Sequence, residues 1–473
     1  MYDRMHEFTA QEIGRIHDAA MELLREPGIA FNDAEALEIF RKHGKKVDGK
    51  VVRLEEADVR AALEAAPARF TIHARNPARD VAVGGDDYVF APGYGAPFLM
   101  TPEGIQREAT LDDYDRLCKL IQTSPYLDMN GFMMVEPSDV PSATAHLDML
   151  FSNIVLCDKA FMGSPVSRQG AVDALEMAGI VWGGKEKLRN HPVTISLINS
   201  LSPLQFSEEM AGSLIELARY GQPCIVAALI MAGSSGPVTL AGVLALQNAE
   251  ILAGITLAQL VNPGTPVVYG STSSAMDMRS GALAIGAPEY PMFVSAAAQM
   301  ARFYGLPCRS GGSLTDSQLP DAQAGLESAL ALSTAVRSGV NFILHSAGIL
   351  GSYIAMSVEK FLLDEELCGM VRKMTSPVTV TEDTIDVAMI RDAGIGGEYL
   401  TQPKTFELCR TEFFLPTLAN RMNYEAWKAE GALDAAARAT RLAEERLGGY
   451  EKPDIDPAVE RDLAAYVQRG KNA

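Results

Sequence analysis

The most polar stretch of an otherwise aliphatic chain lies at residues 311–325, which read GGSLTDSQLPDAQAG. Hydroxyl, carboxyl and amide groups this close together can bind a polar ligand or move a proton. The Ala-rich segment that follows predicts a helix, with Asp321 as its N-cap. With Asp321 used in that way, Asp316 and Gln318 are free to take part in catalysis where the helix begins.

The elements that position these residues alternate between strand and helix from about residue 87. Apolar runs predict strands at 88–100, 128–135, 160–166, 193–200, 224–232, 266–273, 307–313 and 341–348. Helical patterns follow at about 111–123, 142–157, 168–183, 205–220, 237–261, 288–305, 321–338 and 353–374. This alternation, with near-continuous apolar strands, predicts an α/β fold built on a (β/α)8 TIM-type barrel. An open doubly wound sheet is the alternative, although no GxGxxG motif follows an early strand.

The segments on either side of the barrel are predicted to be mainly helical. We expect an N-terminal helical module at 1–86, the barrel at 87–375 and a largely helical C-terminal extension at 376–473. The first helix begins after Thr9, and Glu12 stands three positions later, which is the pattern of a capping box.

In such a barrel the active site forms where the carboxyl ends of the strands meet. Polar and aromatic residues at these ends are the predicted substrate-binding set: Tyr94, Phe98, Asn199, Tyr269, His345 and Tyr353. Small residues there would let a large cofactor approach the backbone: Gly270, Ser271, Gly311 and Gly312. Glu250 lies mid-helix among apolar residues, and it is either a buried catalytic acid or a member of the outer helix ring. The alternatives for His345 and for the tyrosines are a core position and packing at the barrel rim.

Composition excludes several classes of function. A net charge of −19 and a pI near 4.9 argue against nucleic acid or an anionic membrane as partner. Six cysteines without a CxxC pair, and a start without an apolar signal core, favour the cytoplasm. Polar residues interrupt the apolar runs, so no transmembrane helix is expected. No HExxH, P-loop, GxSxG or zinc-spaced cluster occurs, so we predict no metal site.

Longer motifs carry a resemblance to a known family. They are GYGAPF (93–98), LINSLSPLQFSEEM (197–210), YGSTSSAMDMRSGALAIGAPEY (269–290), GGSLTDSQLPDAQAGLES (311–328) and FILHSAGILGS (342–352). Together they resemble the trimethylamine:corrinoid methyltransferase superfamily, over nearly the whole chain.

The resemblance implies a barrel whose mouth binds a methylated amine and receives the cobalamin of a separate corrinoid protein. The methyl group then passes from nitrogen to Co(I), with cobalamin supplied in trans and not held tightly by this chain. It also implies a homo-oligomer, for which the Ala-rich segment 431–448 is a candidate contact. Members that use trimethylamine carry pyrrolysine, which the motif comparison puts at or beside Gln318, and this sequence has none. It is therefore more similar to the non-pyrrolysine branch, which resembles glycine betaine methyltransferases.

These observations predict a corrinoid-dependent methyltransferase for a quaternary amine such as glycine betaine. A quaternary ammonium has a neutral amine as its leaving group, so Co(I) can attack it without covalent activation of the substrate. The four aromatic residues of the predicted set would contact the cation, and His345 and Asn199 the carboxylate. The alternatives are a trimethylamine methyltransferase and a betaine-binding protein without catalysis.

Overall fold

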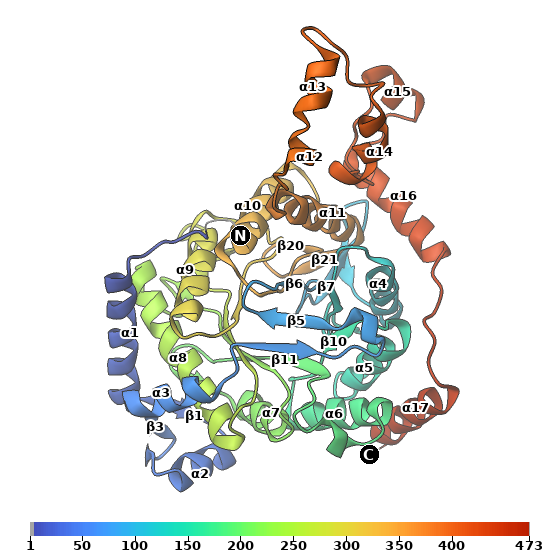
Figure 1. Cartoon of the computed structure of the whole chain (residues 1–473). Helices are drawn as coiled ribbons and strands as arrows, with labels where there is room; N and C mark the ends of the chain where they lie inside the picture. The colour runs from blue at the N-terminus through green and yellow to red at the C-terminus, as the bar shows by residue number, and fades with distance from the viewer. Residues whose placement is uncertain (1–3, 473) are drawn as a thin grey trace.

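Eight parallel strands form a barrel surrounded by helices in the computed structural model, which describes residues 4–472 (Figure 1). In ring order the strands are β6 (Val89–Phe90), β19 (Phe342–Ile343), β18 (Cys308–Arg309), β15 (Val267–Ser271), β13 (Cys224–Ala228), β11 (Thr194–Asn199), β10 (Ala160–Met162) and β9 (Met129–Asn130). The ring closes between β9 and β6, where the N–H of Asp128 donates to the carbonyl of Phe90 at 3.0 Å. The predicted barrel is confirmed.

The surrounding helices begin and end close to the predicted positions. They are α4 (Leu111–Thr123), α5 (Ala145–Leu156), α6 (Arg168–Trp182), α7 (Glu208–Arg219), α8 (Leu240–Val261), α9 (Glu289–Phe303), α10 (Ala322–Ser338) and α11 (Val358–Thr375). Side-chain caps set several of the starts, because they satisfy N–H groups that have no partner inside the helix. Asp321 caps α10 as predicted, and its carboxylate accepts the N–H of Ala324 at 3.0 Å.

The first predicted strand, 88–100, is two short strands. Only β6 belongs to the barrel, whereas β7 (Phe98–Met100) joins a rim sheet with β8 (Gln106–Glu108), β20 (Ile349–Leu350) and β21 (Ala355–Ser357). Between these strands lies Gly93, where a Cβ atom would be 2.6 Å from Cε of Met356 in the rim sheet. Beyond the barrel strand the chain thus passes close to the rim sheet, in which β7 pairs with β21.

The N-terminal module contains α1 (Ala10–Arg25), α2 (Ala34–Lys42) and α3 (Glu56–Ala65), with strands β1 (Ile29–Phe31), β2 (Lys46–Asp48) and β3 (Val51–Arg53). The capping box before α1 is confirmed, since Thr9 and Glu12 each bond the other's backbone N–H. Strand β1 also pairs with β12 (Gln205–Phe206), which follows barrel strand β11. The sheet of the module thus includes a strand from the loop that follows β11, and it is separate from the barrel sheet.

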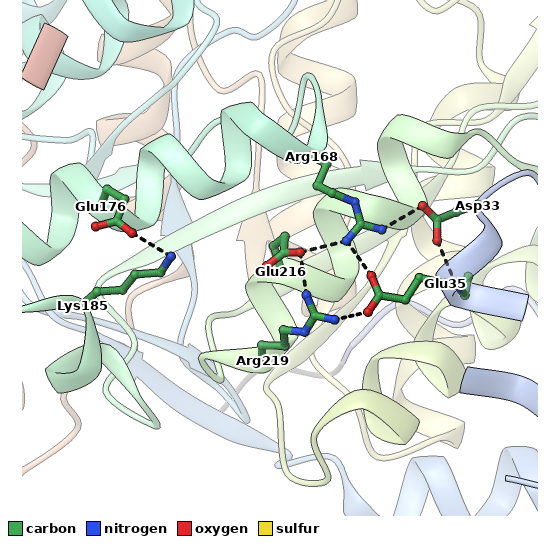
Figure 2. A network of polar contacts seen from close by, with 8 residues as sticks. Asp33, Glu35, Arg168, Glu176, Lys185, Glu216 and Arg219 are labelled. Carbon is green, nitrogen blue, oxygen red and sulfur yellow. Dashed lines mark hydrogen bonds and ion pairs between the residues drawn. The ribbon is translucent and has the colours of Figure 1, made fainter. Parts of the chain in front are cut away.

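An ion-pair network attaches this module to the barrel helices (Figure 2). Arg168 on α6 lies 2.8 Å from Asp33, 2.7 Å from Glu35 and 2.8 Å from Glu216. Arg219 on α7 contacts Glu35 and Glu216 as well. The two arginines hold α2 against α6 and α7.

One end of the barrel is covered by a hairpin of β4 (Arg69–Ile72) and β5 (Val81–Gly84). The N–H of His73 donates to the carbonyl of Pro192 at 2.8 Å, and that of Asn76 to Asp158 at 3.1 Å. Both acceptors directly precede barrel strands, so the hairpin lies at the amino ends of the strands. Short strands β14 (Met231–Ala232), β16 (Ser274–Met276) and β17 (Leu283–Ala284) lie in loops at the opposite, carboxyl end. We call that end the mouth.

Helix α8 is long and apolar enough to cross a membrane by length and composition, contrary to the expectation drawn from interrupted apolar runs. Of its most apolar window, 78% is buried inside the protein. The helix lies between strands β13 and β15 on one side and α1 and α3 on the other. A helix covered on both sides has no polar face, which explains its composition.

After α11 the chain leaves the barrel as an arm and then returns (Figure 1). The departing part holds α12 (Glu382–Ile385), α13 (Val387–Ala393), α14 (Pro403–Glu412) and α15 (Tyr424–Ala429). The returning part holds α16 (Ala435–Gly448), which packs on α11 and α4, and α17 (Pro457–Lys471), which packs on α5 and α6. Ala439 and Ala443 of α16 are buried in these contacts. The Ala-rich face suggested as a subunit contact is therefore used within the chain.

Candidate active site at the barrel mouth

Arg309 is the largest fully buried side chain, and it lies at the carboxyl end of β18. Its Nη1 atom donates to Thr272 at 3.3 Å, and its Nη2 atom lies 3.0 Å from Nε2 of His345. No carboxylate among residues 4–472 forms an ion pair with it, and its Nε atom has no hydrogen-bond partner there. Burial lowers the pKa of the guanidinium, yet arginine stays cationic at neutral pH.

A second buried cation shows the contrast. Lys360 on α11 is as deeply buried, and its Nζ atom lies 2.6 Å from the carboxylate of Asp364. Leaving a buried charge without its partner destabilises a protein by about 3–5 kcal/mol. The protein supplies a carboxylate partner to Lys360, and among the described residues it supplies none to Arg309.

His345 adds a second donor. Its Nδ1 atom accepts the backbone N–H of Tyr94 at 3.2 Å, so the ring proton of the neutral imidazole lies on Nε2, facing Arg309. Burial, and after it the charge of Arg309, holds the pKa of His345 well below its usual value. The imidazole is therefore neutral at pH 7.

Tyr353 and Tyr94 complete this group. The rings of Tyr353 and His345 meet edge to face, with 4.9 Å between their centroids. The hydroxyl of Tyr353 is buried and has no hydrogen-bond partner in the described part of the chain. Burial raises the pKa of both tyrosines, so their hydroxyls stay protonated. We name Tyr94, Thr272, Arg309, His345 and Tyr353 the arginine cluster.

The backbone at this cluster is held in an unfavourable conformation. His345 has φ = 61°, Ser352 55° and Tyr353 78°, all in the left-handed region that favours glycine. Such residues cost about 1–3 kcal/mol each and gather at functional sites. Together, the arginine cluster offers several N–H and O–H donors, one fixed positive charge and no anionic acceptor. It is suited to bind an anion such as a carboxylate.

Asp316, predicted to be catalytic, ties together the loops around the mouth. Its carboxylate accepts the N–H groups of Ile285 at 2.9 Å and Gly286 at 3.0 Å, and the hydroxyl of Ser352 at 2.5 Å. Ser352 directly precedes Tyr353. The carboxylate therefore positions the loop that carries the aromatic ring, and its acceptor capacity is already used by protein donors.

Glu250, also predicted to be catalytic, is buried on α8 and is likewise satisfied. Its carboxylate accepts from Ser200 at 2.5 Å, Ser202 at 2.7 Å and the N–H of Leu204 at 2.8 Å. Burial raises its pKa. These partners form the loop after β11, so the structure assigns Glu250 to holding that loop and not to the arginine cluster.

Tyr269 and Ser271 point away from the barrel interior. The Tyr269 hydroxyl donates to Asn248 at 3.2 Å and the Ser271 hydroxyl to Gln247 at 2.8 Å, both on the outer helix α8. Side chains alternate along a strand, so these two residues share the outer face of β15. They do not lie in the predicted pocket.

The predicted glycines contact protein atoms. A Cβ atom on Gly312, where φ is 109°, would lie 2.3 Å from the carbonyl oxygen of Leu344. Cβ atoms on Gly270 and Gly311 would lie 2.6 Å from Ala227 and 2.3 Å from Ala335. These glycines allow strands and helices to pack closely, and the space beside them is filled.

The other predicted residues lie outside the cluster. Asn199 ends β11 and is exposed, and among the described residues its side chain makes no hydrogen bond to the cluster. Gln318 is also exposed, with its amide 3.4 Å from the carbonyl of Asp316 and close to Gly351. Phe98 packs in the rim sheet with Met100, Ala324, Leu350 and Ala355. Of the predicted binding set, the structure brings together Tyr94, His345 and Tyr353.

Sequence reasoning missed Arg309, which stands inside the predicted strand 307–313 as PCRSGGS. A charged residue within a buried strand was the available signal, since arginine is almost never fully buried unless it is paired.

Comparison with known proteins identifies the family. The model of the family described as trimethylamine methyltransferase (MTTB) matches residues 1–473. The chain belongs to this trimethylamine methyltransferase family. A glycine betaine methyltransferase of Desulfitobacterium hafniense (strain Y51) is 48% identical over 464 residues, covering 98% of this chain and 97% of that protein.

Two relatives of lower identity are named for proline betaine and for trimethylamine. A proline betaine:corrinoid methyltransferase of Eubacterium limosum is 33% identical, and trimethylamine methyltransferase MttB of Methanosarcina thermophila is 32% identical; each comparison covers 97% of this chain and 96% of the relative. Among solved structures, the monomethylamine methyltransferase MtmB of Methanosarcina barkeri superposes with a TM-score of 0.55 at 11% identity, over 95% of this chain and 90% of that one. This similarity supports the barrel fold.

Proposed function

We propose that this chain transfers a methyl group from a betaine, a quaternary amine that also carries a carboxylate, to the Co(I) of a separate corrinoid protein. The observation that carries the proposal is Arg309, a buried cation beside neutral donors and without a carboxylate of its own. Two relatives are named for betaine substrates, glycine betaine and proline betaine. Glycine betaine is our first candidate.

The arginine cluster would bind the two ends of such a substrate differently. The carboxylate would accept from the guanidinium of Arg309 and from the hydroxyl of Tyr353, both of which have donors to spare. The quaternary ammonium would lie against the rings of Tyr94 and Tyr353, each contact contributing about 1–2 kcal/mol when desolvated. Binding of the carboxylate would thus orient the ammonium and fix which of its methyl groups faces the mouth.

No residue of this chain needs to move a proton. The partner's corrinoid would supply the Co(I) nucleophile; the methyl group would pass to it as the N–CH₃ bond breaks, and the amine would leave neutral. The contribution of this chain is to orient the ammonium and exclude water from it. That task agrees with neutral His345 and with carboxylates at Asp316 and Glu250 that are occupied by protein donors.

The loops around the mouth carry exposed apolar side chains. Exposed apolar side chains stand on the loops after five barrel strands: Val166, Leu201, Leu229, Met278 and Leu319. A corrin ring is broad and apolar at its faces, and exposed apolar groups of this kind mark contact surfaces. We propose that these residues meet the partner's cobalamin. We also propose the cytoplasm as the compartment, because all six cysteines are free thiols.

A substrate comparison tests the function. The purified protein and a Co(I) corrinoid protein are mixed with glycine betaine, carnitine, proline betaine, choline or trimethylamine, and the visible spectrum of the corrinoid is followed. We expect methylation with at least one betaine, and a rate at least 100-fold lower with choline, which has a hydroxyl in place of the carboxylate. Equal rates with choline, or activity with trimethylamine alone, would reject the proposal. Betaine binding by calorimetry without any methyl transfer would select the binding protein instead.

A further inference from the structure

The buried ion pair on α11 lies behind the loops of the mouth. Nζ of Lys360 is 2.6 Å from each carboxylate oxygen of Asp364, and both side chains are at most 4% exposed. Burial raises the pKa of Asp364 to about 6, so its carboxylate is mostly ionised at pH 7. Apolar residues of similar volume often serve stability as well as a buried ion pair does. Stability alone therefore does not explain the pair.

The pair is bonded to two of the loops that surround the site. Nζ of Lys360 donates to the carbonyl of Ser313 at 3.0 Å, in the loop after β18. The carboxylate of Asp364 accepts the N–H of Gly348 at 2.9 Å, in the loop after β19. His345 of the arginine cluster lies three residues before Gly348 in that second loop. The ion pair thus reaches the arginine cluster through backbone groups.

A contact between the two loops closes a cycle. The N–H of Ser313 donates to the carbonyl of His345 at 2.7 Å. The backbone from His345 to Gly348 is therefore held at its first residue by Ser313 and at its last residue by Asp364. Lys360 joins these two anchors, because it bonds Ser313 and Asp364 at once. Helix α11 thus fixes this short segment at both ends.

His345 is a residue that needs such support. Its φ of 61° lies in the left-handed region, which a residue other than glycine keeps only when its surroundings hold it there. Rotation of this backbone would move the imidazole, whose Nε2 atom lies 3.0 Å from Nη2 of Arg309. The cycle of contacts therefore holds one donor of the arginine cluster in place.

We propose that Lys360 and Asp364 are positioning residues, which hold His345 where it and Arg309 receive the substrate carboxylate. This inference rests on the proposed function, and it adds that a helix outside the barrel sets the preference for a carboxylate. The carboxylate is remote from the methyl group that reacts, so it is bound equally well before and during the transfer. Loss of such uniform binding raises KM and leaves kcat unchanged. Choline lacks the carboxylate, so its turnover should not depend on the pair.

A double variant tests the proposal with the full-length protein and a Co(I) corrinoid protein. Lys360→Met with Asp364→Leu removes both charges together, so neither is left unpaired. We expect KM for glycine betaine to rise about tenfold, while kcat, and kcat/KM for choline, change less than twofold. The preference for glycine betaine over choline should therefore fall about tenfold. Lys360→Met with Asp364→Asn keeps an amide oxygen for the N–H of Gly348 and should recover part of the loss.

A second buried pair on α11 gives the matched control. Arg446 of α16 lies 2.8 Å from Glu365 of α11, and its other partners are Thr123 and Leu120 of α4. Arg446→Met with Glu365→Leu removes a buried pair from the same helix, so an effect of lost stability alone would appear in both double variants. We expect the control to keep the wild-type KM for glycine betaine and the wild-type preference over choline.

Hydrogen exchange without substrate tests the positioning separately from catalysis. The amides of residues 344–349 should exchange faster in Lys360→Met, Asp364→Leu, and at the wild-type rate in the control. Unchanged exchange there would overturn the proposal, and so would equal losses of betaine and choline turnover. A wild-type protein that methylates the corrinoid with none of the betaines would instead reject the proposed function. Exchange at 344–349 would then still decide whether the pair holds His345.

Discussion

The Nη2 atom of Arg309 lies 3.0 Å from Nε2 of His345, although both nitrogens carry protons when Nδ1 of His345 accepts from Tyr94. Two buried donors facing each other at this distance repel unless an acceptor engages them. A substrate carboxylate is such an acceptor. The repulsion between the two donors therefore destabilises the free site, and a bound carboxylate removes that repulsion.

Replacing Arg309 with lysine should lower kcat/KM for glycine betaine by about 100-fold or more. Lysine provides a charge but not the planar set of donors, and weakening one partner of a buried charge pair costs about 2–5 kcal/mol. Steady-state kinetics with the corrinoid protein measure the effect. The control is Arg337→Lys on the exposed side of α10, for which less than a twofold change is expected. A similar loss in both variants would contradict the assignment.

Arg309→Met should abolish betaine turnover while leaving the free protein at least as stable as wild type. Methionine removes an unpaired buried charge at similar volume, and such replacements are often neutral or stabilising, by about 1–4 kcal/mol. Thermal unfolding without substrate measures this. A decrease of several degrees in the melting temperature would instead mean that Arg309 stabilises the fold.

His345 should stay neutral through the physiological pH range. Its pKa is lowered by burial and by Arg309, so the unfolded chain gains a proton near pH 6.5 that the folded chain does not. The contribution of His345 to stability is therefore complete above about pH 6.5 and is lost as the pH falls below it. The unfolding free energy of wild type minus that of His345→Gln should decrease between pH 6.5 and 5. An inflection in kcat/KM near pH 6.5 that disappears in His345→Gln would refute this assignment.

Asp316→Ala should lower kcat/KM about tenfold or more without removing any group that touches the substrate. Its carboxylate fixes Ile285, Gly286 and Ser352, so its loss frees the loop that holds Tyr353. Hydrogen exchange should become faster at 282–288 and 349–355, and Asp316→Asn should recover part of the activity. Asp277→Asn, in the exposed hairpin nearby, is the control. Unchanged exchange at both loops would show that Asp316 does not position them.

Arg168→Met should reduce the unfolding free energy by about 2 kcal/mol, since hydrogen bonds to charged groups contribute about 1.5–3 kcal/mol. It removes contacts to Asp33, Glu35 and Glu216 that join the N-terminal module to the barrel. Chemical denaturation measures the change. Arg189→Met, which breaks the exposed pair with Glu186, should change it far less, because solvent screens an exposed ion pair. Equal effects would mean that the network adds nothing beyond surface pairing.

Much of the fold could be predicted from local patterns. The segment 111–123 was predicted as a helix with the bounds of α4, and Asp321 was predicted as the cap that it is. Helix periodicity and N-caps depend on neighbours three or four residues apart, so the sequence contains them directly. The long strand predicted at 88–100 was wrong because Phe98–Met100 pairs with Ala355–Ser357, which lies far away in the chain and outside the barrel.

The site residues also differ in whether local sequence could predict them. Strand ends predicted Tyr94, His345 and Tyr353, which the structure brings together, because position in a βα unit decides which end of the barrel a residue occupies. Sequence could not decide which face of a strand buried on both sides turns inward, so it assigned Tyr269 to the pocket when its hydroxyl meets Asn248. Nor could it show that Arg309 lacks a carboxylate, because charge balance inside a barrel depends on residues brought together only by folding. The sequence by itself determined the eight βα units and the family; the tertiary structure alone decided which charge is left without a partner.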